Sequence, residues 1–366
     1  MEQSESLPLD ERIDALMQPL ANACSEFVFY SVNLFGSDVP LIVIWLVVGG
    51  LFFTTYLRFI NFRGFKHAID IVRGKFVEPG DPGQISQFQA LTTAVSGTVG
   101  IGNIAGVAVA ISIGGPGATF WLIVAGLLGM STKLAECTLG VMYRRYENGV
   151  VSGGPMYYLE KGLELKGWPK LGKVLGTFYA ASMVIGCLGI GNMFQSNQAA
   201  SILVSVTGGE ASFFADQIWL LGIILAACVG IVIIGGIQSI AATTSKLVPG
   251  MALLYILMAL LVILINWERI PAAFSAIWSG AFAPQGITGG IIGVMIIGFR
   301  RAVFSNEAGL GSAAIAHSTA RTKEPVSEGF VGLLEPFIDT VVICTLTALV
   351  IITTVYDPSL AGQNVA

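Results

Sequence analysis

The sequence predicts an all-α integral membrane protein with about eight transmembrane helices, two of them interrupted near their middles. Three observations carry this prediction. Of the 366 residues, 54% are hydrophobic and only 11% are charged, whereas a soluble domain has roughly 25% charged residues. The 45 glycines favour close helix packing, because small residues let helix backbones approach one another in lipid. Long apolar runs alternate with polar connections from residue 40 onward.

The expected elements follow in chain order. Residues 9–35 have an apolar helical face, typical of an amphipathic helix on the membrane surface. The predicted spans are apolar runs bounded by polar or glycine-rich connections: 40–57, 84–113, 118–143, 174–206, 218–236, 247–265, 289–317 and 331–356. Counting Arg300 and Arg301 of the seventh span, alternate connections hold sixteen Lys and Arg residues against two on the other side, which places the N-terminus outside the cell.

The first interrupted span carries Gly97, Gly100 and Gly102 in the middle of residues 93–113. Glycine favours a helix break, and a break at membrane depth leaves N–H and C=O groups that lipid cannot satisfy. The broken ends must therefore be buried in protein or line a cavity. The half before the break offers carbonyls that suit Na⁺, and the half after it offers N–H groups that suit a carboxylate. We expect a binding site there.

The second interrupted span begins with only ten apolar residues, 289–298, about 15 Å of helix against a hydrocarbon core about 30 Å thick. Phe299, Arg300 and Arg301 then stand at the expected break. Arginines at this depth need a cavity or a carboxylate, and the candidates are Glu307, Glu335 and Asp339. The two interrupted spans run in opposite directions, which is typical of an inverted-repeat transporter with its site between the broken helices.

Other polar residues and the cysteines are expected to have structural roles. Lys133 and Glu136, three residues apart on one predicted helix, are expected to neutralise each other. His67 and His317 are expected at the surface. The five cysteines are not at metal-ligand spacing, so no transition-metal site is expected. No basic patch with interleaved aromatic residues and no catalytic motif is present, which argues against nucleic-acid binding and against an enzyme.

Two segments resemble the signatures of the alanine or glycine:cation symporter family: Gly-Thr-Val-Gly-Ile-Gly-Asn-Ile-Ala-Gly at 97–106 and Phe-Ser-Asn-Glu-Ala-Gly-Leu-Gly-Ser at 304–312. Residues 153–158 and 336–340 are also similar to that family. The resemblance implies sodium-coupled symport of alanine or glycine by alternating access across a bacterial inner membrane. It implies a fold like that of the bacterial leucine transporter, with Na⁺ as coupling ion and no cofactor.

The resemblance also implies a division of the chain. Its parts are an extracytoplasmic amphipathic segment, an extra first helix, a first five-helix repeat, the first two helices of a second repeat and a short tail: 1–39, 40–57, 84–265, 289–356 and 357–366. The family typically has eleven spans, so the chain is expected to be truncated at its C-terminus.

Site residues follow from the match of residues 99–103 to the broken segment of the leucine transporter. Gly100 and Gly102 would bind the substrate carboxylate through their backbone. Thr98 and Asn103 would lie near both the substrate and one cation. The carbonyls of Ser96 and Val99 would form half of another cation site. The substrate would also meet two more distant side chains: Gln195 and Phe299.

Simpler interpretations stay open at this stage. The glycines could serve only close packing, Asn103 an interhelical hydrogen bond, and Gln195 a polar helix face. The chain could also be a passive channel or facilitator, or a non-transporting fragment, and protons could replace sodium.

Overall fold

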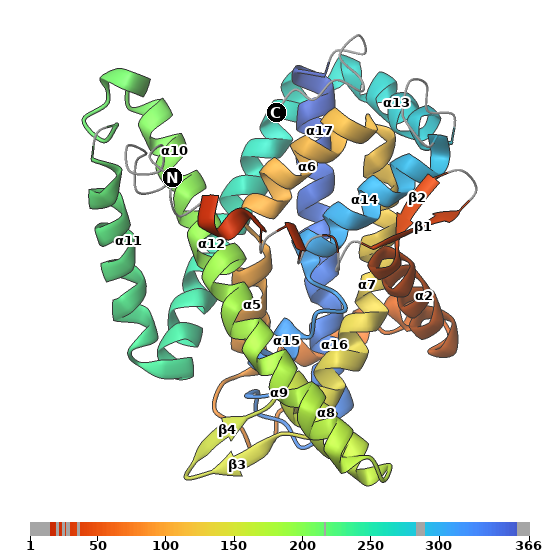
Figure 1. Ribbon diagram of the computed structural model, residues 1–366, viewed down its shortest axis with the longest axis vertical. Coiled ribbons are helices and arrows are strands. Elements are labelled where there is room, and N and C mark those ends of the chain that lie inside the picture. The colour runs from red at the N-terminus through yellow and green to blue at the C-terminus, as the bar shows by residue number, and fades with distance from the viewer. Residues whose placement is uncertain are drawn as a thin grey trace.

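The computed structural model describes residues 15–19, 22–23, 26, 30–34, 37–215, 217–282 and 290–356. The described chain is an assembly of helices with two small antiparallel hairpins (Figure 1). The hairpins pair β1 (Ser31–Leu34) with β2 (Ser37–Pro40), and β3 (Arg145–Glu147) with β4 (Val150–Ser152). Because β1 is a strand, the end of the amphipathic helix expected over residues 9–35 is wrong. Residues 15–19 are helical, and most of the rest of that stretch lies outside the described residues.

The helices of the first two thirds are α2 (Leu41–Tyr56), α3 (Ile60–Arg63), α4 (Phe65–Val72), α5 (Gln87–Thr98), α6 (Ile101–Gly114), α7 (Gly117–Met142), α8 (Pro155–Leu165), α9 (Pro169–Gly186), η2 (Cys187–Phe194), α10 (Gln195–Val206), η3 (Gly209–Ala211), α11 (Ile218–Ile233) and α12 (Gly236–Ile265). The remaining ones are η4 (Trp267–Arg269), α13 (Ile270–Phe282), α14 (Gly290–Asn306), α15 (Ser312–His317), α16 (Pro325–Pro336), η5 (Phe337–Cys344) and α17 (Thr345–Thr354).

Each predicted span coincides with one of these helices or with a run of them. Four uninterrupted runs are long and apolar enough to cross a membrane within the described residues: Gly117–Met142, Pro169–Val206, Gly236–Ile265 and Pro325–Thr354. The bent pair α5 and α6 makes a fifth. The apolar helices α2 and α11 have 16 residues each, about 24 Å of helix. A multi-pass membrane protein is therefore confirmed.

Helix α7 lies at the centre of the packing, against α2, α13, α14 and α16 (Figure 1). The largest buried cluster joins α6, α7, α14 and α17 through Val107, Leu122, Ala302 and Ala348. By contrast, α11 buries a single side chain, Leu221, and stands with α10 at one side of the molecule (Figure 1). Residues of α11 and α6 line one cavity.

Backbone hydrogen bonds join the start of the first interrupted span to the end of the second. Ile85, just before α5, forms a parallel β-bridge with Ala320, just after α15. Arg144 reinforces this junction, because its guanidinium donates to the carbonyls of Pro82, Ser318, Ala320 and Thr322 at 2.7–3.0 Å. These contacts hold the two segments together at this end of the molecule.

Candidate functional site

The first interrupted span is broken where the sequence predicts it. α5 starts with a capping box, in which Ser86 Oγ accepts from Gln89 N while Gln89 Oε1 accepts from Ser86 N. It ends at Thr98, α6 begins at Ile101, and the two axes differ by 43°. Gly100 N–H donates to Asn103 Oδ1 at 2.7 Å instead of to the preceding turn. The side chain of Asn103 therefore stabilises the broken backbone.

The break leaves backbone groups of both signs unpaired. The N–H groups of Ile101 and Gly102 have no backbone acceptor among the described residues, and the carbonyls of Ser96 and Thr98 have no backbone donor there. The start of α6 is thus a positive helix end and the end of α5 a negative one. Such an arrangement can hold an anion and a cation side by side.

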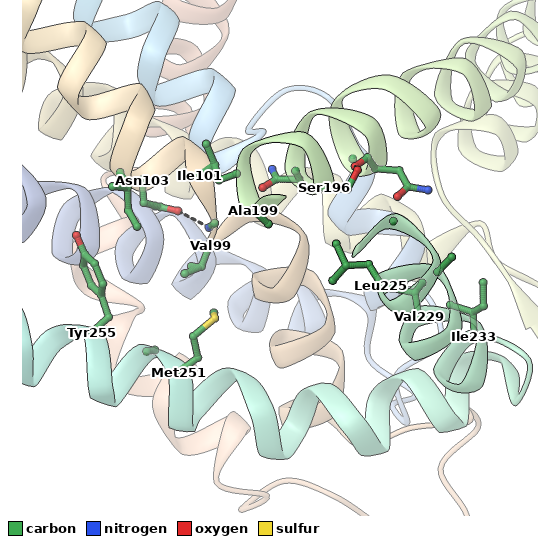
Figure 2. Close-up of a pocket in the computed structure, with 18 of the residues that line it drawn as sticks. Val99, Ile101, Asn103, Ser196, Ala199, Leu225, Val229, Ile233, Met251 and Tyr255 are labelled. Carbon is green, nitrogen blue, oxygen red and sulfur yellow. Dashed lines mark hydrogen bonds between the residues drawn. The ribbon is translucent and has the colours of Figure 1, made fainter. Parts of the chain in front are cut away.

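A cavity of about 710 Å³ opens at the break, between α5–α6, α10, α11 and α12. Figure 2 shows its lining, with Asn103 hydrogen-bonded at the break and Met251 and Tyr255 on the facing helix. Gln195 lies closest to the break, since a β-carbon on Gly100 would be 3.5 Å from its Oε1. The remaining walls are mostly apolar, for example Ala199 and Leu225. The cavity suits a small molecule with one polar end.

A buried carboxylate lies behind the break. Asp339, in η5, accepts from Asn103 Nδ2 at 2.6 Å, from Ser305 Oγ at 2.8 Å and from Thr340 Oγ1 at 2.7 Å. Asp339 is fully buried. Within the described part of the chain it forms no ion pair with a Lys, Arg or His. Its charge is therefore met by neutral donors alone. Through Asn103, this network reaches the cavity.

Asp339 and Ser305 were not predicted as site residues. The available signal was an ionisable residue in an apolar predicted span, since Glu335 and Asp339 both lie within 331–356 and such residues mark a functional site by default. From the sequence, Asp339 was expected only as a partner for Arg300 or Arg301. The sequence does not specify which residues of α14 and η5 lie opposite each other. The local π-helix at Phe337–Cys344 also alters which side chains face α6. π-helical segments often accompany functional sites.

The other predicted site residues fall in different places. Val99, Gly100, Asn103 and Gln195 line the cavity. Gly102 is buried against α14, where a β-carbon would come 3.4 Å from Ser305 Cα. Thr98 is buried, with its hydroxyl donating to the Val95 carbonyl at 3.3 Å. The exposed Ser96 donates to the Thr93 carbonyl at 2.6 Å.

Phe299 is not at the second break, so that prediction is wrong. α14 continues to Asn306, and the break occupies residues 307–311. Phe299 packs instead in the main core cluster and does not line the large cavity. The helix continues because the first glycines that adopt positive φ after its start are Gly309 and Gly311; the arginines at 300 and 301 do not end it.

The predicted pairing of Lys133 with Glu136 is also wrong. Lys133 Nζ lies 3.1 Å from Glu335 Oε1, whereas Glu136 Oε1 accepts from Gly309 N at 2.6 Å, in the second break. Glu335 and Asp339 thus serve partners other than the two arginines. His317 is fully buried and 2.6 Å from Glu328, contrary to the expected surface position, while His67 is exposed.

A membrane protein with a transmembrane helix broken at a cavity, and with a buried carboxylate behind the break, has the architecture of a transport protein. Comparison with known proteins makes this specific. Residues 22–365 match the sodium:alanine symporter family, and the chain belongs to that family. It is therefore a member of a class of transporters and not of a class of enzymes.

Three relatives illustrate the match. The sodium/alanine symporter AgcS of Methanococcus maripaludis is 43% identical over 324 residues, which cover 87% of this chain and 69% of the relative. An uncharacterized transporter of Haemophilus influenzae is 39% identical, covering 93% and 73% respectively. The probable sodium/glutamine symporter GlnT of Bacillus subtilis is 35% identical, covering 88% and 65%. The chain thus spans roughly two thirds to three quarters of these relatives' lengths.

Proposed function

We propose that the chain carries out sodium-coupled symport of a small neutral amino acid, alanine or glycine, by alternating access across a bacterial inner membrane. One observation carries the proposal. Asn103 joins the backbone of the first break, through Gly100 N at 2.7 Å, to the buried carboxylate of Asp339, through Oδ1 at 2.6 Å, and the unpaired N–H groups of Ile101 and Gly102 lie directly between Gly100 and Asn103 in the chain. An anion site and a cation site therefore share one side chain.

The cation site is built around Asp339. Its carboxylate is buried among neutral donors, and burial of an uncompensated charge is costly, so a monovalent cation would stabilise it. The hydroxyls of Ser305 and Thr340 now donate to Asp339, but each oxygen also has lone pairs that can turn toward an ion. The carbonyls of Ser96 and Val99 remain the proposed half of another cation site, supported by the absence of backbone donors to them in the described chain.

The substrate site is the start of α6. A substrate carboxylate fits the N–H groups of Ile101 and Gly102, and a small side chain fits the apolar wall near Ala199. Gln195 can take the remaining polar group. Because Phe299 lies elsewhere, Phe304 is the aromatic residue nearest the break: its ring is 3.6 Å from a β-carbon built on Gly102.

The fold proposal is an inverted-repeat architecture like that of the leucine transporter, with repeats over 84–265 and 289–356 after an extra helix at 40–57. Support comes from the two interrupted spans, which are expected to run in opposite directions. The helices next to their breaks, α6 and α14, also pack together. The relatives' names also support sodium coupling, since AgcS and GlnT are both described with sodium and an amino acid.

Uptake in proteoliposomes tests the proposal. Purified chain should accumulate radiolabelled alanine against a gradient only when Na⁺ is imposed outside, and not with a proton gradient alone. Glycine and glutamine as competitors then define the substrate class. Equal fluxes with and without a sodium gradient would indicate a facilitator, and absence of both uptake and alanine binding would refute the proposal.

A further inference from the structure

A second cavity, of about 230 Å³, lies between α2, α7 and the second break. Apolar side chains of α2, including Leu46 and Phe53, form one wall, and Asn306 and Gly309 form another. Glu136 is the single charged residue in its lining. This cavity is separate from the large one at the first break, and neither the substrate nor the sodium proposal uses it.

The two oxygens of Glu136 have different surroundings. Oε1 accepts from Gly309 N–H at 2.6 Å. Oε2 is buried and has no hydrogen-bond partner among the described residues. The whole side chain is 7% exposed. A carboxylate with one bare oxygen at such a place carries a large desolvation cost unless a cation or a proton reaches it.

The ionisable neighbours supply only a share of one positive charge. They come from α7, the second break, α8, α9 and α16: Lys133, Cys137, Glu307, Tyr158, Tyr179 and Glu335. Lys133 is the one cation among them, and it already binds Glu335 at 3.1 Å. Glu307 accepts from the Ser312 hydroxyl. Three carboxylates thus share one ammonium group. No cluster of His, Cys, Asp or Glu in the described chain has an arrangement suited to a metal ion.

We propose that Glu136 is a proton-binding site that exchanges through this second cavity. A proton from water forms an O–H bond on Oε2 and neutralises the carboxylate, while Oε1 keeps Gly309 N–H and so holds the second break in the conformation seen here. The conformation of the second break is then linked to proton binding at Glu136. The proposal goes beyond sodium coupling and does not require that the chain transport alanine.

Infrared difference spectroscopy and thermal unfolding test the site on purified full-length protein. At neutral pH the wild type should show the carbonyl band of a protonated carboxylic acid, and Glu136→Gln should lose it. The glutamine keeps an acceptor for Gly309 N–H, so the variant should fold. If it does not, Glu136→Asp should shift the band instead. A band that is absent from the wild type, or unchanged in both variants, overturns the proposal.

The pH dependence of stability gives an independent measurement. A folded state that holds one proton more than the unfolded chain loses stability as pH rises, with the unfolding constant increasing up to about tenfold per pH unit. This slope should be reduced in Glu136→Gln between pH 5.5 and 8.5. The matched control is Glu147→Gln, an exposed change in β3 far from this cluster, and it should keep the wild-type slope. Equal slopes in the wild type and Glu136→Gln contradict the proposal.

Discussion

The Asp339 side chain connects three segments of the chain at the candidate site. Its carboxylate meets α6 through Asn103, α14 through Ser305 and its own segment through Thr340. These three donors are neutral, so they stabilise the carboxylate through dipoles and leave its charge for an ion. The residue is thus better suited to binding a cation than to holding the helices together.

Asp339→Asn is expected to weaken Na⁺ binding by at least about tenfold, equal to about 1.4 kcal/mol, because the amide has the same size without the charge. Folding should persist, since neutral donors surround the position. Sodium titration of alanine binding by the purified protein measures the effect. Glu147→Gln, an exposed change in β3, should behave as wild type. A sodium affinity that does not change in Asp339→Asn would remove Asp339 from the cation site.

Gly100→Leu is expected to abolish alanine binding, because the added side chain starts 3.5 Å from Gln195 Oε1 and enters the cavity. The backbone at Gly100 is extended, with φ −169°, so the substitution strains no dihedral. Equilibrium binding of labelled alanine is the measurement. Gly97→Leu provides the control: a β-carbon there meets no atom within 4 Å, and binding should survive. Retained affinity in Gly100→Leu would place the substrate elsewhere.

At the scale of elements, the sequence could predict the first break but not the second. Gly97, Gly100 and Gly102 are a local signal, and the chain bends among them. The second break depends on tertiary partners, since Glu136 of α7 holds Gly309 from 173 positions away. The same limit explains why the partners predicted for Lys133 and Asp339 differ from those in the structure. Spacing along one helix suggested partners, whereas packing between α7, α14 and α16 selected others.

Arg144→Ala is expected to open the junction between the segments before α5 and after α15, at the end of the molecule that the charge distribution predicts to be cytoplasmic. The guanidinium joins four carbonyls from the segments before α5 and after α15. Burial lowers the pKa of Arg144, but an arginine stays charged in proteins. Each such charge-assisted hydrogen bond contributes about 1.5–3 kcal/mol, so losing even one shifts the open–closed equilibrium about tenfold.

Cysteine accessibility measures this opening. With Cys24, Cys187 and Cys228 replaced by serine, Ala199→Cys in the cavity should react slowly with an impermeant maleimide applied from the cytoplasmic side. Adding Arg144→Ala should speed that reaction, and Arg144→Lys should have a smaller effect, because one ammonium cannot reach all four carbonyls. Arg145→Ala is the control, since Arg145 pairs with Glu160 outside the junction. Unchanged reactivity in Arg144→Ala would show that other contacts keep this end closed.

For the whole molecule, hydropathy and charge were enough for the class of protein, and two motifs for the family. The apolar runs became helices with boundaries close to those expected, because a backbone in lipid must satisfy its own hydrogen bonds. What the sequence could not supply is the set of contacts between runs. Gly102 against Ser305 and Asn103 against Asp339 join positions more than 200 residues apart, and no local pattern specifies them.

The orientation of the molecule is the remaining prediction at this scale. Counting Arg300 and Arg301 of α14, the basic side carries sixteen Lys and Arg residues against two on the other side. The structure gathers β3, β4 and α8 at one end and α13 at the other (Figure 1). In the same cysteine-depleted background, Glu147→Cys on β3 should react with an impermeant maleimide in inside-out vesicles only. Ser275→Cys on α13 should react in right-side-out vesicles only, because its connection holds the single basic residue Arg269. The reverse pattern would invert the proposed direction of both breaks, and the junction closed by Arg144 would then face the cell exterior.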